Sequence, residues 1–386
     1  MHASLCYVFL QVAIEKFDLS QGGEAEAMST VPVYEDHISL WQNELTAWVP
    51  QQIFDAHVHL GPPEIMAPFS SHRTREALTT FRGFTYEESR SFYKKLYSGK
   101  QILGQIAFGF PLREVDIISA NNYIAQTARR DRSVYPFILA DPNNIDGTID
   151  QWRYWADAGV RFVGVKPYFD LLGINRPNSV FHCRDIDFTP VSLLEFMEKE
   201  KLVLMLHTSS IGGGDPAVRG FVAMVAMTYP HIRILLAHMG RYTEPSQFQR
   251  LLRSPVLDLP NVFLEMSSAS SWKVYAAILR RRELHDKLLF GSDVPFGLIT
   301  GVEHFSDTHG PVFITRHDYA WSDPDLQRQF YTRRQGLTYN TYHVIIALKR
   351  AMDELNMGPD EQDDLKHRIF SRNVLDRVLS SMRSDA

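Results

Sequence analysis

The chain has 386 residues, of which 45% are hydrophobic and 22% are charged, and its net charge is −5 at pH 7. This composition is ordinary for a folded globular protein and argues against both a disordered chain and a basic nucleic-acid-binding surface. The two cysteines, Cys6 and Cys183, form no CxxC pair and indicate a reducing compartment rather than a disulfide framework.

Residues 1–45 are interpreted as a poorly ordered leader or N-terminal extension. Its first segment, Met1 to Ile14, is apolar, but it lacks the basic region and the small-residue cleavage site of a signal peptide. No apolar run reaches the roughly 18 residues that a membrane-spanning helix needs, so we expect a cytoplasmic protein. Residues 46–386 are predicted to form one domain.

Eight short apolar runs follow in that domain. They are continuous rather than alternating, which is typical of parallel strands that are buried on both faces. The runs are Gln52 to His57, Ile102 to Phe110, Ser133 to Ala140, Phe162 to Lys166, Leu202 to His207, Ile232 to His238, Val262 to Met266 and Leu288 to Asp293.

Segments with helical spacing lie between these runs. They are Asp116 to Arg130, Gly147 to Ala158, Thr189 to Lys201, Asp215 to Tyr229, Glu244 to Leu252 and Ser271 to Leu284, and two more helices are predicted in Tyr339 to Met382. A strand-helix rhythm repeated eight times favours a closed (β/α)8 barrel, the TIM barrel, over a doubly wound sheet.

Three connections between these elements are long: Gly61 to Gln101, Tyr168 to Asp187 and Pro295 to Tyr339. All three leave the carboxyl ends of predicted strands, where barrel enzymes build their active sites. The first connection is rich in aromatic and charged residues and is predicted to form a lid. His304 and His309, in the third, are interpreted as solvated loop residues, with substrate contact as the alternative.

Ionisable residues stand at or next to the carboxyl ends of the predicted strands. They are His57 and His59 after the first run, Lys166 at the end of the fourth, His207 at the end of the fifth, His238 at the end of the sixth and Asp293 at the end of the eighth. In a closed barrel these ends converge on one mouth. His57 and His59 are two residues apart on a strand, so their side chains share a face. Imidazole and carboxylate ligands together suit zinc, manganese or iron, whereas a lone histidine at a strand end is more often structural.

Three segments resemble the amidohydrolase superfamily: Asp55-Ala56-His57-Val58-His59-Leu60-Gly61, Leu236-Ala237-His238-Met239-Gly240 and Phe290-Gly291-Ser292-Asp293-Val294-Pro295-Phe296. Within it, the chain is similar to the amidohydrolase-related group that includes aminocarboxymuconate-semialdehyde decarboxylase. That further resemblance is carried by Asn121-Asn122-Tyr123-Ile124-Ala125, Gly164-Val165-Lys166-Pro167 and Ile369-Phe370-Ser371-Arg372-Asn373.

The resemblance implies a distorted (β/α)8 barrel that performs hydrolysis or decarboxylation at a divalent metal. By position, it implies His57, His59, His207 and Asp293 as the metal ligands. Asp293 would also be the general base. His238 would polarise the substrate or orient the water.

Lys166 has two interpretations under the resemblance. A carboxylated lysine would bridge two metal ions, whereas an unmodified lysine would be a cation beside one ion. We favour one ion, zinc before manganese or iron, with Lys166 binding a substrate carboxylate. Arg113 and Arg241, near the predicted mouth, are further substrate-binding candidates, with a surface ion pair as the alternative.

The expected activity is hydrolysis of a C–N or C–O bond in a small, acidic substrate. Non-oxidative decarboxylation of an unsaturated or aromatic acid is the alternative, because both reactions need the same metal and the same acid–base pair. A metal-binding protein without catalysis is the rival of another class, but the sequence keeps both Asp293 and His238. A homodimer is left open, and neither nucleic acid nor a membrane is expected as a partner.

Overall fold

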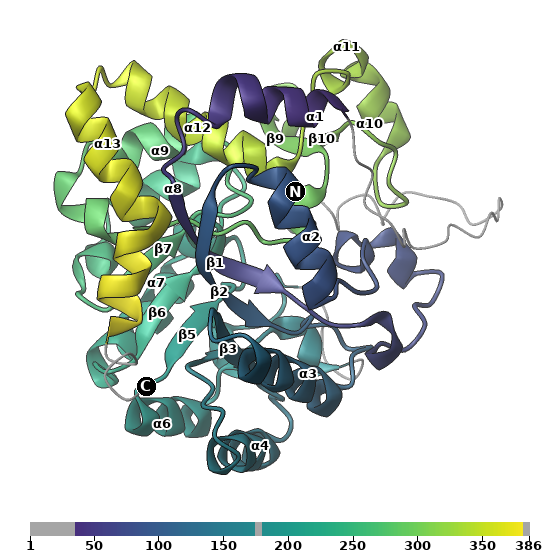
Figure 1. Ribbon diagram of the computed structural model, residues 1–386, viewed down its shortest axis with the longest axis vertical. Helices are drawn as coiled ribbons and strands as arrows, with labels where there is room; N and C mark the ends of the chain where they lie inside the picture. The colour runs from purple at the N-terminus through teal and green to yellow at the C-terminus, as the bar shows by residue number, and fades with distance from the viewer. Residues whose placement is uncertain (1–34, 174–179, 381–386) are drawn as a thin grey trace.

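In the computed structural model, which describes residues 35–173 and 180–380, eight parallel strands follow one another in chain order around a barrel (Figure 1). Backbone hydrogen bonds join the last strand to the first, from Ala56 to Phe290 at 2.9 Å and from His59 to Val294 at 2.8 Å. The strands are β1 (Gln52–His59), β2 (Gln101–Phe108), β3 (Val134–Leu139), β4 (Gly164–Lys166), β5 (Val203–Leu206), β6 (Arg233–Leu236), β7 (Val262–Glu265) and β8 (Leu288–Leu289). The predicted (β/α)8 barrel is confirmed.

The strands lie where the continuous apolar runs predicted them because both of their faces are covered. Every residue of β4, β5, β7 and β8 is buried, and β1 is exposed only at Gln52. The outer cover is α3 (Ile117–Arg130), α4 (Ile145–Asp157), α6 (Val191–Glu200), α7 (Pro216–Thr228), α8 (Pro245–Leu252) and α9 (Trp272–Leu279). The last of these is shorter than predicted, because a 3-10 segment, η10 (Arg282–Lys287), follows it.

Several helices begin at residues whose side chains cap them. Asp116 accepts a hydrogen bond from the backbone N–H of Ser119 at the start of α3, and Asn144 accepts one from that of Gly147 at the start of α4. Such capping satisfies backbone donors that have no partner within the helix. The capping residues therefore fix where each connection ends and each helix begins.

The three long connections carry structure of their own. The first contains η3 (Pro63–Ile65), η4 (Arg73–Arg75), η5 (Ala77–Thr79) and α2 (Tyr86–Leu96). The second contains η6 (Phe169–Leu172) and α5 (Asp185–Phe188), and its residues 174–179 lie outside the described residues. The third contains η11 (Phe296–Leu298), a hairpin of β9 (Gly301–Ser306) and β10 (Gly310–Thr315), α10 (Pro324–Gln329) and α11 (Tyr331–Arg334). Shorter turns are η7 (Gly212–Gly214), η8 (Ala237–Gly240) and η9 (Pro255–Asp258).

Both ends of the described chain pack on the barrel. The predicted extension over residues 1–45 lies outside the described residues up to residue 34, and then forms α1 (Glu35–Leu40) and η2 (Trp41–Leu45). Trp41 is fully buried and stacks on Tyr342 of α12 (Asn340–Glu354), with ring centroids 5.7 Å apart. The chain then continues through α13 (Pro359–His367), η12 (Arg368–Arg372) and η13 (Val374–Val378), so the predicted pair of C-terminal helices is present. Within residues 35–173 and 180–380, no helix combines the length and apolar character that crossing a bilayer requires.

Candidate metal centre

Two histidines at the carboxyl end of β1 point into the barrel mouth. His57 and His59 are both buried, and their ring centroids lie 5.2 Å apart. They occupy alternate positions on one strand, which places both rings on the same face. The His-x-His spacing therefore brings two imidazoles to one point, as the sequence predicted.

Asp293 joins these two rings from the loop after β8. Its Oδ1 lies 3.3 Å from Nε2 of His57 and 3.1 Å from Nε2 of His59. The backbone N–H of Asp293 donates to the carbonyl of His57 at 2.8 Å, and Ser268 donates to Oδ2 at 3.3 Å. The carboxylate is thus held by backbone and side chain, with one oxygen directed at the two histidines.

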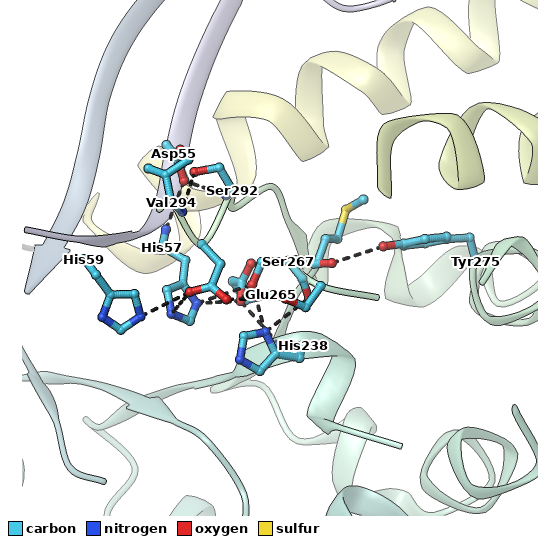
Figure 2. A network of polar contacts seen from close by, with 12 residues as sticks. Asp55, His57, His59, His238, Glu265, Ser267, Tyr275, Ser292 and Val294 are labelled. Atoms are coloured by element: carbon cyan, nitrogen blue, oxygen red, sulfur yellow. Dashed lines mark hydrogen bonds and ion pairs between the residues drawn. The ribbon is translucent and has the colours of Figure 1, made fainter. Parts of the chain in front are cut away.

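The Nδ1 atoms of the two histidines face acceptors. Nδ1 of His57 lies 2.8 Å from a carboxylate oxygen of Glu265 (Figure 2), and Nδ1 of His59 lies 3.3 Å from the carbonyl oxygen of Gly109. A carboxylate or carbonyl oxygen accepts hydrogen bonds, so Nδ1 carries the proton in each ring. Nε2 of each ring then presents its lone pair to Asp293, as metal-binding histidines usually do.

His238, after β6, is held in the same tautomer. Its Nδ1 lies 2.9 Å from Oγ of Ser267 and 3.2 Å from the Ser267 carbonyl, while that hydroxyl donates to Glu265 at 2.7 Å. Because the hydroxyl proton is used toward Glu265, Ser267 accepts from Nδ1 of His238. Nε2 of His238 is therefore an acceptor.

A divalent cation fits this arrangement. Nε2 of His57 and Oδ1 of Asp293 are buried and make no hydrogen bond, although both are acceptors and face each other at 3.3 Å. Two acceptors at this distance repel each other unless a cation or proton lies between them. In tetrahedral coordination with metal–nitrogen bonds of about 2.05 Å, neighbouring ligand atoms lie about 3.3 Å apart. His57, His59 and Asp293 thus form a candidate metal-binding group.

The remaining predicted residues line a small pocket over this group. His207, Lys166 and His238 line it together with His57 and His59, and Leu78 and Phe296 are among its apolar lining residues. The ring of His207 lies 5.4 Å from that of His238 between centroids. Nζ of Lys166 lies 5.0 Å from the centroid of the Phe108 ring. The three histidines and the lysine of the later strands therefore share one pocket with His57 and His59, but His207 belongs to neither group of described residues whose ligand atoms lie close enough together to share one ion.

Burial shapes the charges of these groups. It lowers the pKa of the four site histidines well below the ordinary value, which keeps them neutral and able to bind a cation. Burial also lowers the pKa of Lys166 to about 8, against the opposing effect of Asp293 and Glu265. Asp293 moves the other way, since burial raises the pKa of its carboxyl.

Two carboxylates that the sequence analysis did not select hold the site together. Glu265, at the end of β7, accepts from the Nδ1–H of His57 and from the backbone and hydroxyl of Ser267. Asp55 on β1 accepts from the backbone N–H groups of Ser292 at 2.8 Å and His57 at 3.1 Å (Figure 2). The signal for Glu265 was its place in the seventh apolar run, at the same strand end as the predicted ligands. It forms a second candidate metal-binding group with His57 and His238.

The two predicted substrate-binding arginines are bound to other groups near the metal pocket. Arg113 donates to the buried carboxylate of Asp170 at 2.6 Å, in a cluster that also contains Arg73. Arg241 is buried, and its guanidinium donates to the carbonyl of Thr208. Neither arginine lines the metal pocket among the described residues, so Lys166 is the cation there.

The loops at the mouth contain unusual backbone conformations. Positive φ angles occur at five non-glycine residues after β6, β7 and β8: His238, Met239, Arg241, Ser268 and Asp293. Each costs on the order of 1–3 kcal/mol, and such conformations concentrate at functional sites. Two of these residues, His238 and Asp293, are held in place by hydrogen bonds from their backbone N–H groups, to Glu265 and to the carbonyl of His57.

A family model described as Amidohydrolase matches residues 54–301, which is more than half of the chain. No curated protein matches the sequence. Among solved structures, 5-carboxyvanillate decarboxylase from Sphingomonas paucimobilis is 14% identical, with 84% of this chain and 98% of that chain covered and a TM-score of 0.50. 4-Oxalomesaconate hydratase from Rhodopseudomonas palustris is also 14% identical, with 86% of this chain and 98% of that chain covered and a TM-score of 0.47. At such identities the likeness shows the fold alone.

Proposed function

This chain belongs to the amidohydrolase family, and we propose that it is a metal-dependent hydrolase that cleaves a C–N or C–O bond in a small acidic substrate. The family is metal-dependent, and the candidate ligand groups lie at the barrel mouth. The observation that carries the proposal is the pair of buried acceptors, Nε2 of His57 and Oδ1 of Asp293, that face each other beside Lys166 and His238.

In this proposal His57, His59, His207 and Asp293 hold one divalent ion, with zinc favoured over manganese and iron. The ion, when bound, supplies a Lewis acid toward water and toward an oxygen of the substrate. Asp293 accepts the proton of the attacking water and passes it to the leaving nitrogen or oxygen. Ser268 keeps the second carboxylate oxygen of Asp293 oriented during this transfer.

His238 and Lys166 have two different roles in this proposal. Because Nδ1 of His238 donates to Ser267, its Nε2 accepts a hydrogen bond and is suited to orient the water. Lys166 binds the anionic group of the substrate at the other side of the pocket. Leu78 and Phe296 line the same pocket, and their apolar side chains limit the space for a substrate to a small molecule.

Decarboxylation of an unsaturated or aromatic acid is the second candidate. It is favoured by the position of Lys166, a buried amine between the rings of Phe108 and Tyr168, with Nζ 5.0 and 5.8 Å from their centroids. A carboxylate and an adjoining planar body would find an ion-pair partner and aromatic surfaces in this corner of the pocket.

A substrate panel tests the proposal. Lactones, amides and aromatic carboxylates are incubated with metal-loaded protein, while products are followed by mass spectrometry and CO2 release in parallel. Hydrolysis products that disappear in Asp293→Asn support the first candidate, and CO2 release supports the second. A fully metal-loaded protein that hydrolyses none of the esters and amides and releases no CO2 contradicts both.

A further inference from the structure

A second cavity, of about 320 Å3, lies beside the metal pocket and shares no lining residue with it. Its walls come from the loops after β6 and β7, from strand β9 and from helix α12. A volume of this size is at the lower end of the range for small-molecule sites. Figure 1 shows β9 and β10 beside α12, away from strand β1, which carries His57 and His59.

The charges around this cavity are mainly positive. Lys273, Arg333 and Arg350 line it, and all three side chains are exposed enough to meet a ligand from solvent. Among the described lining residues, Glu303 carries the one carboxylate, and it accepts a hydrogen bond from the hydroxyl of Tyr242 at 2.7 Å. The lining residues therefore carry two more positive than negative charges, and because Arg350 is also paired with Glu354 at 3.5 Å, Lys273 and Arg333 are the two cations that the proposal uses.

Two histidines in the lining contribute no charge near neutral pH. His304 accepts a hydrogen bond from Arg333 at 2.7 Å, and His343 accepts one from the backbone N–H of Thr338 at 3.1 Å. An accepting ring nitrogen carries no proton, and burial together with Arg333 lowers the pKa of His343 to about 4. The positive field of the cavity therefore comes from fixed cations and does not switch off near pH 7.

The same cavity has an aromatic wall. The guanidinium of Arg350 lies 4.5 Å from the centroid of the Trp272 ring, and Tyr242 and Ile346 complete this side. Stacking on an aromatic ring orients a guanidinium while leaving its N–H groups able to bind an anion. A ligand could therefore pack its apolar part against this wall while its acidic groups contact the cations that line the cavity.

We propose that this cavity is a binding site for a small organic dianion with an aromatic or other flat apolar body. Lys273 and Arg333 match two carboxylates or phosphates, and the wall around Trp272 matches the flat body. The site is separate from the metal pocket. One loop connects the two, since Ser268 donates to Asp293 while Ser270, two residues on, accepts from the backbone of Glu303.

Calorimetric titration of benzene-1,3-dicarboxylate into the metal-loaded protein tests the proposal. We expect saturable binding that weakens with added salt, and no binding of the neutral benzene-1,3-dicarboxamide. The double variant Lys273→Gln/Arg333→Gln should bind the dianion about tenfold or more weakly, because it loses the two charged hydrogen-bond donors. The matched control is Arg282→Gln/Lys199→Gln, which removes two exposed cations outside the cavity and should bind like the parent.

Binding in the metal pocket is the competing outcome, and Lys166→Met separates it. Under the proposal Lys166→Met binds the dianion as the parent does, with an unchanged melting temperature as the check on folding for each variant. Absence of saturable binding at millimolar dianion overturns the proposal. So does binding that survives in Lys273→Gln/Arg333→Gln, or that is lost in Lys166→Met.

Discussion

Glu265 accepts a hydrogen bond from Nδ1 of His57 at 2.8 Å and thereby determines which nitrogen of that ring faces Asp293. The two residues are 208 positions apart and meet because β7 and β1 both end at the barrel mouth. The same carboxylate accepts from Ser267, which in turn holds His238. One buried carboxylate therefore fixes the tautomers of two histidines of the site.

Glu265→Gln should weaken metal binding by about 10- to 100-fold, because the substitution keeps the shape but removes the charge that orients His57. Titration of the metal-free protein with Zn2+ against a chromophoric chelator measures the affinity. Glu303→Gln removes a carboxylate outside the metal pocket and serves as the control. Equal affinities for Glu265→Gln and the parent would show that Glu265 does not position the ligand.

Removal of the metal should lower the melting temperature, because an ion that binds only the folded state stabilises it. The gain is about 2.7 kcal/mol when the free ion is at 100 times its dissociation constant. Elemental analysis should find about one ion per chain in the parent and far less in His57→Ala. His72→Ala, which changes an exposed histidine, should retain the ion. Equal metal content in all three proteins would argue against the site.

The position of a residue at a strand end was enough to group three of the predicted ligands. The apolar runs located the barrel strands, and the ends of parallel strands necessarily meet, so His57, His59 and Asp293 could be grouped without coordinates. The position of a residue in the sequence does not show which other side chain it will contact. Glu265 stands at such an end too, but its contact with His57 depends on packing across the barrel.

The contacts of Arg113 and Arg241 could not be predicted from the sequence either. Arg113 and Arg241 stand in the right loops, but the direction of a long side chain is decided by its nearest acceptor. For Arg113 that acceptor is Asp170, 57 residues away. The hairpin β9–β10, within Pro295 to Tyr339, was also not predicted, because its strands alternate only weakly between exposed and buried residues.

Asp170→Ala should destabilise the protein by about 3–5 kcal/mol, because the buried carboxylate pairs with both Arg73 and Arg113 at 2.6 Å. The loss would leave two largely buried guanidinium groups without this partner. Asp150→Ala removes an exposed carboxylate paired with Arg153, and its effect should stay within about 0.5 kcal/mol. Urea denaturation midpoints compare the two, and similar shifts would contradict the prediction.

The unfolding free energy of Asp185→Asn should increase relative to that of the parent as the pH rises. Burial raises the pKa of Asp185 from 3.8 to about 6, so the folded state binds the proton more tightly than the unfolded state. The stability that this carboxyl contributes is present at low pH and is lost between about pH 4 and 6.

The asparagine side chain can keep the hydrogen bonds to Ser209 without carrying a charge. The difference in unfolding free energy between Asp185→Asn and the parent should therefore grow by up to about 3 kcal/mol between pH 4 and pH 7. Denaturant titrations of both proteins at several pH values measure it. A constant difference, or one that grows toward low pH, would be the wrong sign.

Lys166 is the residue on which the one-metal and two-metal proposals differ. Its amine is buried beside Phe108, and its pKa of about 8 leaves it mostly protonated at pH 7. The charged form suits an unmodified lysine that binds the anionic group of the substrate, and this is the form that we expect. Lys166→Ala should then raise KM strongly while the metal content stays near one ion per chain. The KM of the parent should also rise above about pH 8, as the amine loses its proton.

A carboxylated lysine would give the opposite result, because the carbamate would itself be a ligand. The parent would then hold two ions per chain, and Lys166→Ala would hold one or none. Short-chain carboxylic acids would partly restore metal binding and activity to Lys166→Ala by replacing the missing carboxylate. Lys166→Arg separates the two cases further, since it keeps a cation in the pocket but cannot form the carbamate. Partial activity in Lys166→Arg with one ion bound supports the cation, whereas loss of an ion from that variant supports the bridging ligand.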